Sequence, residues 1–170
     1  MNDPMKRALL STGFFASAGI LSFFFFAPSN LVLWPNTLFY AVIVLNTFFS
    51  VRFFARITPH SWTQSVVDGV LVLIYLALAL SLGREWAFPF FALCIFVAAP
   101  IKYVLMLGKI PHSDLLRRKL LIELLGAGLC TAALLCAVFL GYPLTAAWTL
   151  AIIFSLANIY LLAIRPMYRL

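Results

Sequence analysis

The chain has 170 residues, of which 65% are hydrophobic and only 10% are charged. A soluble domain has about 45–50% apolar and about 25% charged residues, and so short a chain cannot bury this much apolar surface in one core. The composition therefore excludes an ordinary soluble domain and favours a protein that lies in lipid. The net charge of +7 does not indicate nucleic-acid binding, because the basic residues lie in short clusters between apolar runs.

Apolar runs of the length that crosses a bilayer, about 20 residues, recur along the whole sequence. In chain order, we predict six transmembrane helices at 8–26, 37–55, 65–83, 86–108, 115–140 and 144–164. No segment between them is long enough for a separate soluble domain. We therefore expect residues 1–170 to form a single integral membrane domain of the all-α class, a polytopic helix bundle.

The turns between some of these helices are very short. Gly83-Arg84-Glu85 joins the third and fourth helices, and Gly141-Tyr142-Pro143 joins the fifth and sixth. Connections this short make the flanking helices antiparallel neighbours. The sequence thus predicts a bundle of three helical hairpins, each of which starts and ends on the same side of the membrane.

The lysine and arginine residues predict the orientation of these hairpins. Short loops that are rich in Lys and Arg stay in the cytoplasm. With six helices, only Arg84 falls on one side, and ten basic residues fall on the other: Lys6, Arg7, Arg52, Arg56, Lys109, Arg117, Arg118, Lys119, Arg165 and Arg169. We therefore expect a multi-pass protein of the cell (inner) membrane with both termini in the cytoplasm.

The hairpins also share a sequence pattern. Asn46, Lys102 and Asn158 lie in the second, fourth and sixth helices, and each is 56 positions from the next. Parallel repeats related by an axis along the membrane normal have this signature. The pattern predicts a pseudo-threefold repeat, although hairpins of equal length would give part of the same spacing without one.

Glycines lie near the inner ends of the odd-numbered helices, at Gly13, Gly69 and Gly126, and the hairpins turn on Pro and Gly, as at Ala27-Pro28 and Gly141-Tyr142-Pro143. In these features nearly the whole chain resembles the HdeD-like acid-resistance membrane proteins, which are built from tandem two-helix repeats. The resemblance implies an inner-membrane protein without an assigned enzymatic reaction.

Three ionisable residues lie inside the predicted helices: Asp68, Lys102 and Glu123. Such groups are costly in lipid, usually face the interior of the bundle, and are functional candidates. Asp68 and Lys102 belong to one hairpin and can meet as an ion pair, while Lys119 lies one turn before Glu123 on the same helix face. The candidate intramembrane polar site consists of Asp68, Lys102, Glu123, Asn46 and Asn158.

This polar cluster has two interpretations. It forms either a cytoplasm-facing polar pocket or ion path, or a set of structural ion pairs and interhelical hydrogen bonds, each worth about 0.6 kcal/mol. The sequence contains no HExxH, GxSxG or P-loop motif, and Cys94, Cys130 and Cys136 form no CxxC pair. We therefore predict no catalytic residues, no metal and no cofactor, and we expect no nucleic-acid partner.

Three functions remain open, and each predicts a different structure. The leading hypothesis is a small non-enzymatic accessory, sensing or stress-response protein, which works by helix packing with a second copy or another membrane protein. It predicts that the charged residues point at other helices with no cavity. The alternative is a small transporter or the substrate-binding subunit of one, with a cavity that opens to the cytoplasm. A membrane enzyme on lipid substrates would need a nucleophile and a base within hydrogen-bond reach.

Overall fold

The computed structural model describes residues 4–26, 30–57, 62–106, 113–164 and 166–168. These residues form helices and turns, without a β-strand among them. The helices are α1 (Pro4–Phe25), α2 (Leu33–Ile57), α3 (Trp62–Ala79), α4 (Ala87–Met106), α5 (Ser113–Phe139) and α6 (Pro143–Ile159), which continues as a π-helix (Tyr160–Ile164). Each of the six helices is long and apolar enough to cross a membrane, so the prediction of an all-α, multi-pass membrane protein is confirmed.

The helix ends differ from the predicted ones by up to four residues when the π-helix is counted with α6, for local reasons. Pro4 opens α1 and Pro35 lies in the first turn of α2, positions where proline loses no intrahelical hydrogen bond. Both helices therefore begin before the apolar run that predicted them. α3 ends earlier than predicted, because the apolar residues after Ala79 form the turn to α4. There the backbone N–H of Arg84 donates to the carbonyl of Ser81 at 2.8 Å.

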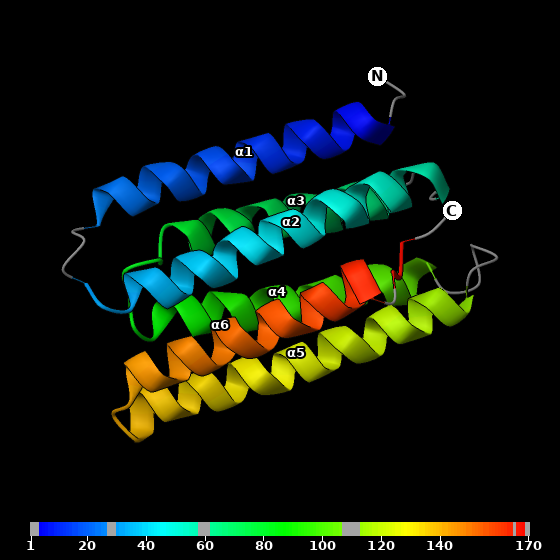
Figure 1. The fold of residues 1–170 in the computed structure, drawn as a ribbon. Helices are drawn as coiled ribbons and strands as arrows, with labels where there is room; N and C mark the ends of the chain where they lie inside the picture. The colour runs from blue at the N-terminus through cyan, green and yellow to red at the C-terminus, as the bar shows by residue number, and fades with distance from the viewer. Residues whose placement is uncertain (1–3, 27–29, 58–61, 107–112, 165, 169–170) are drawn as a thin grey trace.

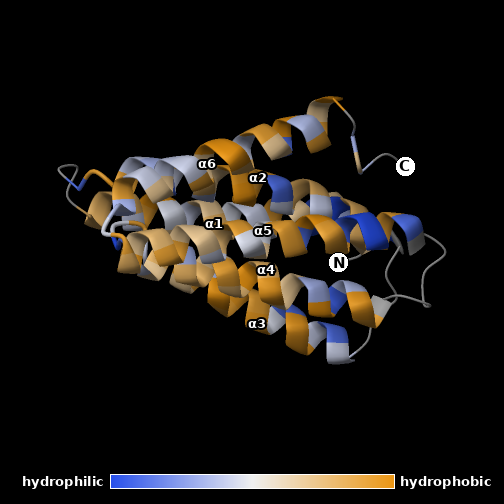
Figure 2. Cartoon of the chain, turned by 90° about the horizontal axis from the view of Figure 1, so that it is seen from below, coloured by the Kyte–Doolittle hydropathy of each residue, from blue (hydrophilic) through white to orange (hydrophobic). Residues whose placement is uncertain are grey.

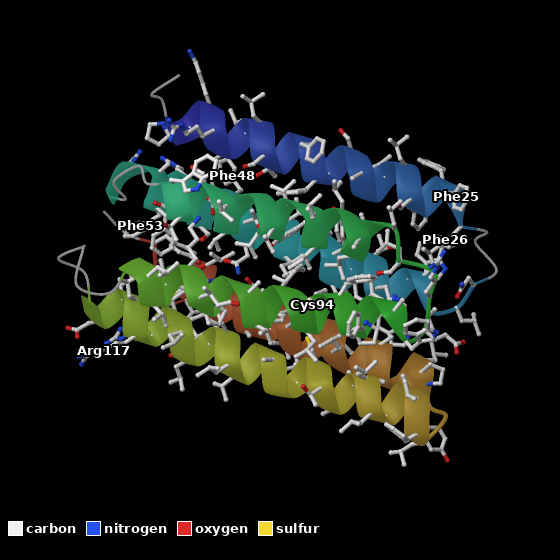
Figure 3. The ribbon with its side chains drawn as sticks, turned by 180° about the vertical axis from the view of Figure 1, so that it is seen from behind. Phe25, Phe26, Phe48, Phe53, Cys94 and Arg117 are labelled. Carbon is white, nitrogen blue, oxygen red and sulfur yellow. The ribbon has the colours of Figure 1, made fainter. Side chains whose placement is uncertain are left out.

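The helices alternate in direction along the chain (Figure 1). We call the end at which α1, α3 and α5 begin the basic end, and the opposite end the turn end. Figure 3 shows Phe53 and Arg117 at the basic end and Phe25 and Phe26 at the turn end. In Figure 2 the strongly hydrophilic residues gather mainly at the basic end, near the two termini.

The most closely packed helix pairs form a closed ring in the order α1, α2, α6, α5, α4, α3 and back to α1. Figure 1 shows α1 and α5 at opposite outer edges, with the other four helices between them. The hairpins contact each other through three different combinations of helices: α4 packs on α5, α2 packs on α6, and α1 packs on α3. A threefold axis would need three equivalent contacts, so these pairings do not show the predicted repeat.

Aromatic side chains of α2, α4 and α6 fill the ring in its middle and towards the turn end. The Phe39 ring lies 4.4 Å from the ring of Phe154 and 5.6 Å from that of Phe88, centroid to centroid. Phe96 packs on Phe154 at 5.7 Å. These contacts bring α2 and α4 together across the ring and separate α6 from the space between α1 and α3.

The turn end is held closed by two asparagine side chains. The amide nitrogen of Asn30 donates to the carbonyl of Gly83 at 2.6 Å, and that of Asn36 donates to the carbonyl of Leu82 at 2.8 Å. Because Gly83 and Leu82 belong to the turn between α3 and α4, these bonds fasten the start of α2 to the next hairpin. The basic end carries the cavity described below.

Candidate functional site

A cavity of about 390 Å³ extends from the basic end of the bundle past its middle. Five helices line it, α1 to α5, and α6 supplies no lining residue within the part of the chain that the structure describes. Arg7 and Ser65 lie in the first turns of α1 and α3, line the cavity and are exposed. The cavity therefore opens at the basic end. Its volume falls within the range of small-molecule sites, about 300–1,000 Å³.

Two ion pairs lie in the cavity wall. The first joins α3 to α4: the ammonium group of Lys102 donates to a carboxylate oxygen of Asp68 at 2.6 Å. Its side chains are 18% and 48% exposed, respectively, so the pair is accessible from within the cavity. The contact between Asp68 and Lys102 that the sequence suggested is thus confirmed.

The second ion pair lies within α5 and is much less accessible. The ammonium of Lys119 is 2.8 Å from a carboxylate oxygen of Glu123, and the two side chains are 3% and 7% exposed. Lys119 also lies between two aromatic rings, 5.9 Å from the centroid of Tyr103 and 5.8 Å from that of Tyr168. Such cation–π contacts stabilise a desolvated ammonium group, so Lys119 is held in place from three sides.

The floor of the cavity is formed by an aromatic pair with a hydroxyl pair beside it. The rings of Phe15 and Tyr75 stack at 4.6 Å between centroids. The hydroxyl oxygens of Tyr75 and Thr47 lie 2.6 Å apart, within hydrogen-bond distance. Tyr75 is 13 residues past the start of α3, which places it about 20 Å along the helix at 1.5 Å per residue. The cavity thus reaches deep into the bundle.

The lining becomes mostly apolar with depth, apart from the hydroxyl groups of Thr47 and Tyr75 at the floor. The polar lining residues are Arg7, Ser11, Asn46, Thr47, Ser50, Gln64, Ser65, Asp68, Tyr75, Lys102, Lys119 and Glu123, and most of them lie within three turns of the basic end. The apolar ones are Phe15, Ile43, Val51, Phe54, Ala55, Leu71, Val72, Ile95, Phe96 and Ala99, and the deepest of these are Phe15, Ile43, Ile95 and Phe96. An amphipathic molecule would fit this gradient with its polar part near the mouth.

The two asparagines predicted for the site have different surroundings. Asn46 lines the cavity, and its side-chain oxygen accepts a hydrogen bond from the Tyr168 hydroxyl at 3.4 Å. Asn158 is buried elsewhere, in α6, where its amide nitrogen donates to the carbonyl of Phe154 at 2.9 Å. Its side-chain oxygen has no hydrogen-bond partner among the described residues. The structure therefore brings Asp68, Lys102, Glu123 and Asn46 into one cavity, without Asn158.

Several cavity residues were not singled out from the sequence, although their spacing contains a signal. Tyr75 lies seven residues after Asp68, two helical turns along the same face. Arg7, Ser11 and Phe15 follow each other at intervals of four residues along α1. Tyr168, which is not a lining residue but contacts Asn46, carries no such signal, because it follows α6 and its π-helix and reaches Asn46 through the fold alone.

The described residues contain no group of three or more His, Cys, Asp or Glu side chains that could hold a metal ion. The charged lining residues are instead three cations, Arg7, Lys102 and Lys119, and two anions, Asp68 and Glu123, which pair with Lys102 and Lys119. Charges arranged in this way can bind a polar solute by exchanging their partners.

Comparison with known proteins gave no further information about this site. No family model, no curated protein and no solved structure matches the chain.

Proposed function

We propose that this protein binds a small solute in a membrane-embedded pocket that opens to the cytoplasm, as a small transporter or the substrate-binding subunit of one. The observation that carries the proposal is the cavity of about 390 Å³ with both ion pairs in its wall. A deep pocket with a few polar groups that converge on it is the usual form of a small-molecule site. Ionisable groups in transmembrane segments also mark substrate pathways.

The exposure of the first ion pair favours this proposal over a role in helix packing alone. Asp68 and Lys102 connect α3 to α4, as a structural pair would, but both line the cavity and their side chains are 48% and 18% exposed. Charged groups that face a cavity in this way are available to a solute. Lys119 and Glu123 are buried, and Lys119 contacts the rings of Tyr103 and Tyr168, so the second pair holds the wall of the cavity in place.

The orientation follows from the charges. The basic end carries the exposed side chains of Lys6, Arg7, Arg56, Arg117 and Arg118, whereas Arg84 lies at the turn end. Lys109, Arg165 and Arg169 lie outside the described residues. By the positive-inside rule, we place the basic end, and with it the cavity mouth, in the cytoplasm of a cell with the chain in its inner membrane.

The other expectations from the sequence stay predictions. These are the pseudo-threefold repeat, the resemblance to HdeD-like proteins, an accessory or stress-response role with a second copy or a membrane partner, and an enzyme acting on lipids. The cavity supports none of them specifically.

The proposal can be tested by the chemical accessibility of the cavity. In a variant with Cys94, Cys130 and Cys136 replaced by alanine, a single cysteine is introduced at Ala99, which lines the cavity. A charged, membrane-impermeant thiol reagent is applied to inside-out and right-side-out vesicles. Because a thiol reacts as its thiolate and needs water, we expect labelling of Ala99→Cys in inside-out vesicles only.

Three control positions define the outcome. Arg118→Cys reports the basic end, Glu85→Cys the turn end, and Leu125→Cys, at a position that is 66% exposed on the outer surface of α5, reports a side chain in lipid. Ala99→Cys should behave like Arg118→Cys. If it stays as unreactive as Leu125→Cys, the cavity is dry and the proposal fails. If it behaves like Glu85→Cys, the proposed orientation is wrong.

A further inference from the structure

Building on the proposed function, we propose that the solute is a small zwitterion with an apolar side chain, of the α-amino-acid type. Its ammonium group would bind Asp68 and its carboxylate would bind Lys102, in place of the contact that these residues make with each other. Its apolar part would lie against the deep wall formed by Phe15, Ile43 and Phe96.

The accessible charges of the cavity carry the first step of this inference. Asp68 and Lys102 are one anion and one cation in direct contact, and both are partly exposed to the cavity. A ligand with a single charge can pair with only one of them and leaves the other without its partner. Separating a pair in this way is costly in a poorly solvated site, whereas a zwitterion supplies a new partner to both residues.

The second ion pair supports the same conclusion. Lys119 is enclosed by Glu123, Tyr103 and Tyr168, and with an exposure of 3% it is not available to a ligand. This pair therefore adds a cation and an anion that cancel. Arg7, in the first turn of α1, adds a cation only at the mouth. Below the mouth the charges of the wall balance, so the wall there does not favour a ligand with a net charge of either sign.

The shape of the cavity carries the third step. Lys102 and Asp68 are separated by only 2.6 Å, so the two charges of the ligand must also lie close together, as the ammonium and carboxylate of an α-amino acid do. Below them Phe15, Ile43, Ile95 and Phe96 form the apolar part of the wall, beside the hydroxyl groups of Tyr75 and Thr47. Burying an aliphatic side chain there is favourable because it removes apolar surface from water.

The test uses three probes with the same branched apolar body and different charges: L-leucine, leucinamide and 4-methylpentanoate. Binding to the purified full-length chain in lipid nanodiscs is measured by calorimetry, with thermal stabilisation as a second measurement. We expect L-leucine, the zwitterion, to bind at least 10-fold more tightly than leucinamide, the cation, and 4-methylpentanoate, the anion.

Two neutral variants separate the roles of the pair. Asp68→Asn should shift the preference towards 4-methylpentanoate, because Lys102 then lacks an anionic partner. Lys102→Gln should shift it towards leucinamide. Glu85→Gln changes an exposed charge at the turn end and should leave all three affinities unchanged. If either single variant fails to fold, the order of the three affinities on the natural chain still tests the zwitterion proposal.

Binding of 4-methylpentanoate or leucinamide as tight as that of L-leucine would overturn the zwitterion proposal, and so would the absence of binding by all three probes. In both cases, labelling of Ala99→Cys from the cytoplasmic side would leave the proposed solute pocket standing. Absence of that labelling would remove the pocket and the zwitterion proposal together.

Discussion

Tyr168 contacts residues far apart in the sequence at the basic end of the bundle. Its ring lies over the ammonium of Lys119 and 5.8 Å from the ring of Phe53, and its hydroxyl reaches Asn46. Through these contacts the segment after the last helix packs against α2 and α5. Together with Tyr103 it places an aromatic ring next to the buried Lys119 ammonium.

We predict that Tyr168→Ala destabilises the protein by about 1–3 kcal/mol, because it removes a cation–π contact and an aromatic pair. Tyr168→Phe should cost less than about 1 kcal/mol, because it keeps the ring and loses only a long hydrogen bond of 3.4 Å. Unfolding by SDS in mixed micelles measures both changes. Tyr142→Ala, at a 64% exposed position, serves as the control. A loss in Tyr168→Phe equal to that in Tyr168→Ala would show that the ring does not act on Lys119.

The contacts of single residues could be predicted only where the sequence brings them together. Asp68 and Lys102 were expected to meet because a short turn makes α3 and α4 antiparallel neighbours. Lys119 and Glu123 were expected to meet because they are one helical turn apart. Asn158 was grouped with Asn46 because the two lie at the same position in their hairpins, with a spacing of 56 residues per hairpin. In the structure, however, the aromatic contacts of Phe39 lie between α6 and the cavity. Spacing along the chain does not show which helices are separated from a cavity by others.

At the scale of helices, the packing of α1 on α2 depends on one glycine. A Cβ atom on Gly19 would lie 2.8 Å from Cδ1 of the Tyr40 ring and closer still to Cε1. Tyr40 cannot move away freely, because its hydroxyl donates to the carbonyl of Phe15 at 2.9 Å. Gly13, on the same helix, has no atom within 4 Å of such a Cβ. Gly13 is therefore a matched control for a substitution at Gly19.

We predict that Gly19→Ala destabilises the protein by about 1–3 kcal/mol through overpacking. Gly13→Ala should be neutral or stabilise it by up to about 1 kcal/mol through helix propensity. Thermal unfolding in detergent with a fluorescent thiol or tryptophan signal gives the comparison. Equal effects of the two substitutions would mean that α1 does not pack against Tyr40 in the membrane.

The number of membrane-spanning helices could be predicted from hydropathy, whereas the pairing of helices from different hairpins could not. Six apolar runs correspond to six helices, because a chain that crosses lipid must satisfy its backbone hydrogen bonds within a helix. The hairpin turns predicted α3 beside α4 and α5 beside α6. The pairing of α2 with α6 and of α1 with α3 depends on side-chain packing in the assembled ring, and hydropathy contains no information about it.

At the scale of the whole molecule, the two ends of the bundle differ in packing. The turn end is filled by aromatic rings and fastened by Asn30 and Asn36. The basic end holds the cavity and its polar residues. Water that enters the cavity would reach the helices around it, whereas aromatic rings fill the bundle towards the turn end.

We therefore predict faster amide hydrogen exchange at the basic end than at the turn end. In lipid nanodiscs, peptides from 47–55 of α2 should exchange faster than peptides from 36–44 of the same helix. The comparison within one helix controls for its overall stability, because opening of a region sets its exchange rate. Uniform protection along α2 would contradict a water-filled cavity.

The position of α6 in the ring also bears on how the chain is made. All described residues that line the cavity belong to the first five helices, and α6 fits between α2 and α5. A nascent chain that has released α5 into the membrane thus already contains every described residue of the pocket wall, while the side of Phe39 that Phe154 will cover still faces lipid. α6 then completes the ring of helices without adding a described residue to the cavity wall, so the step that closes the bundle is separate from the step that forms the cavity.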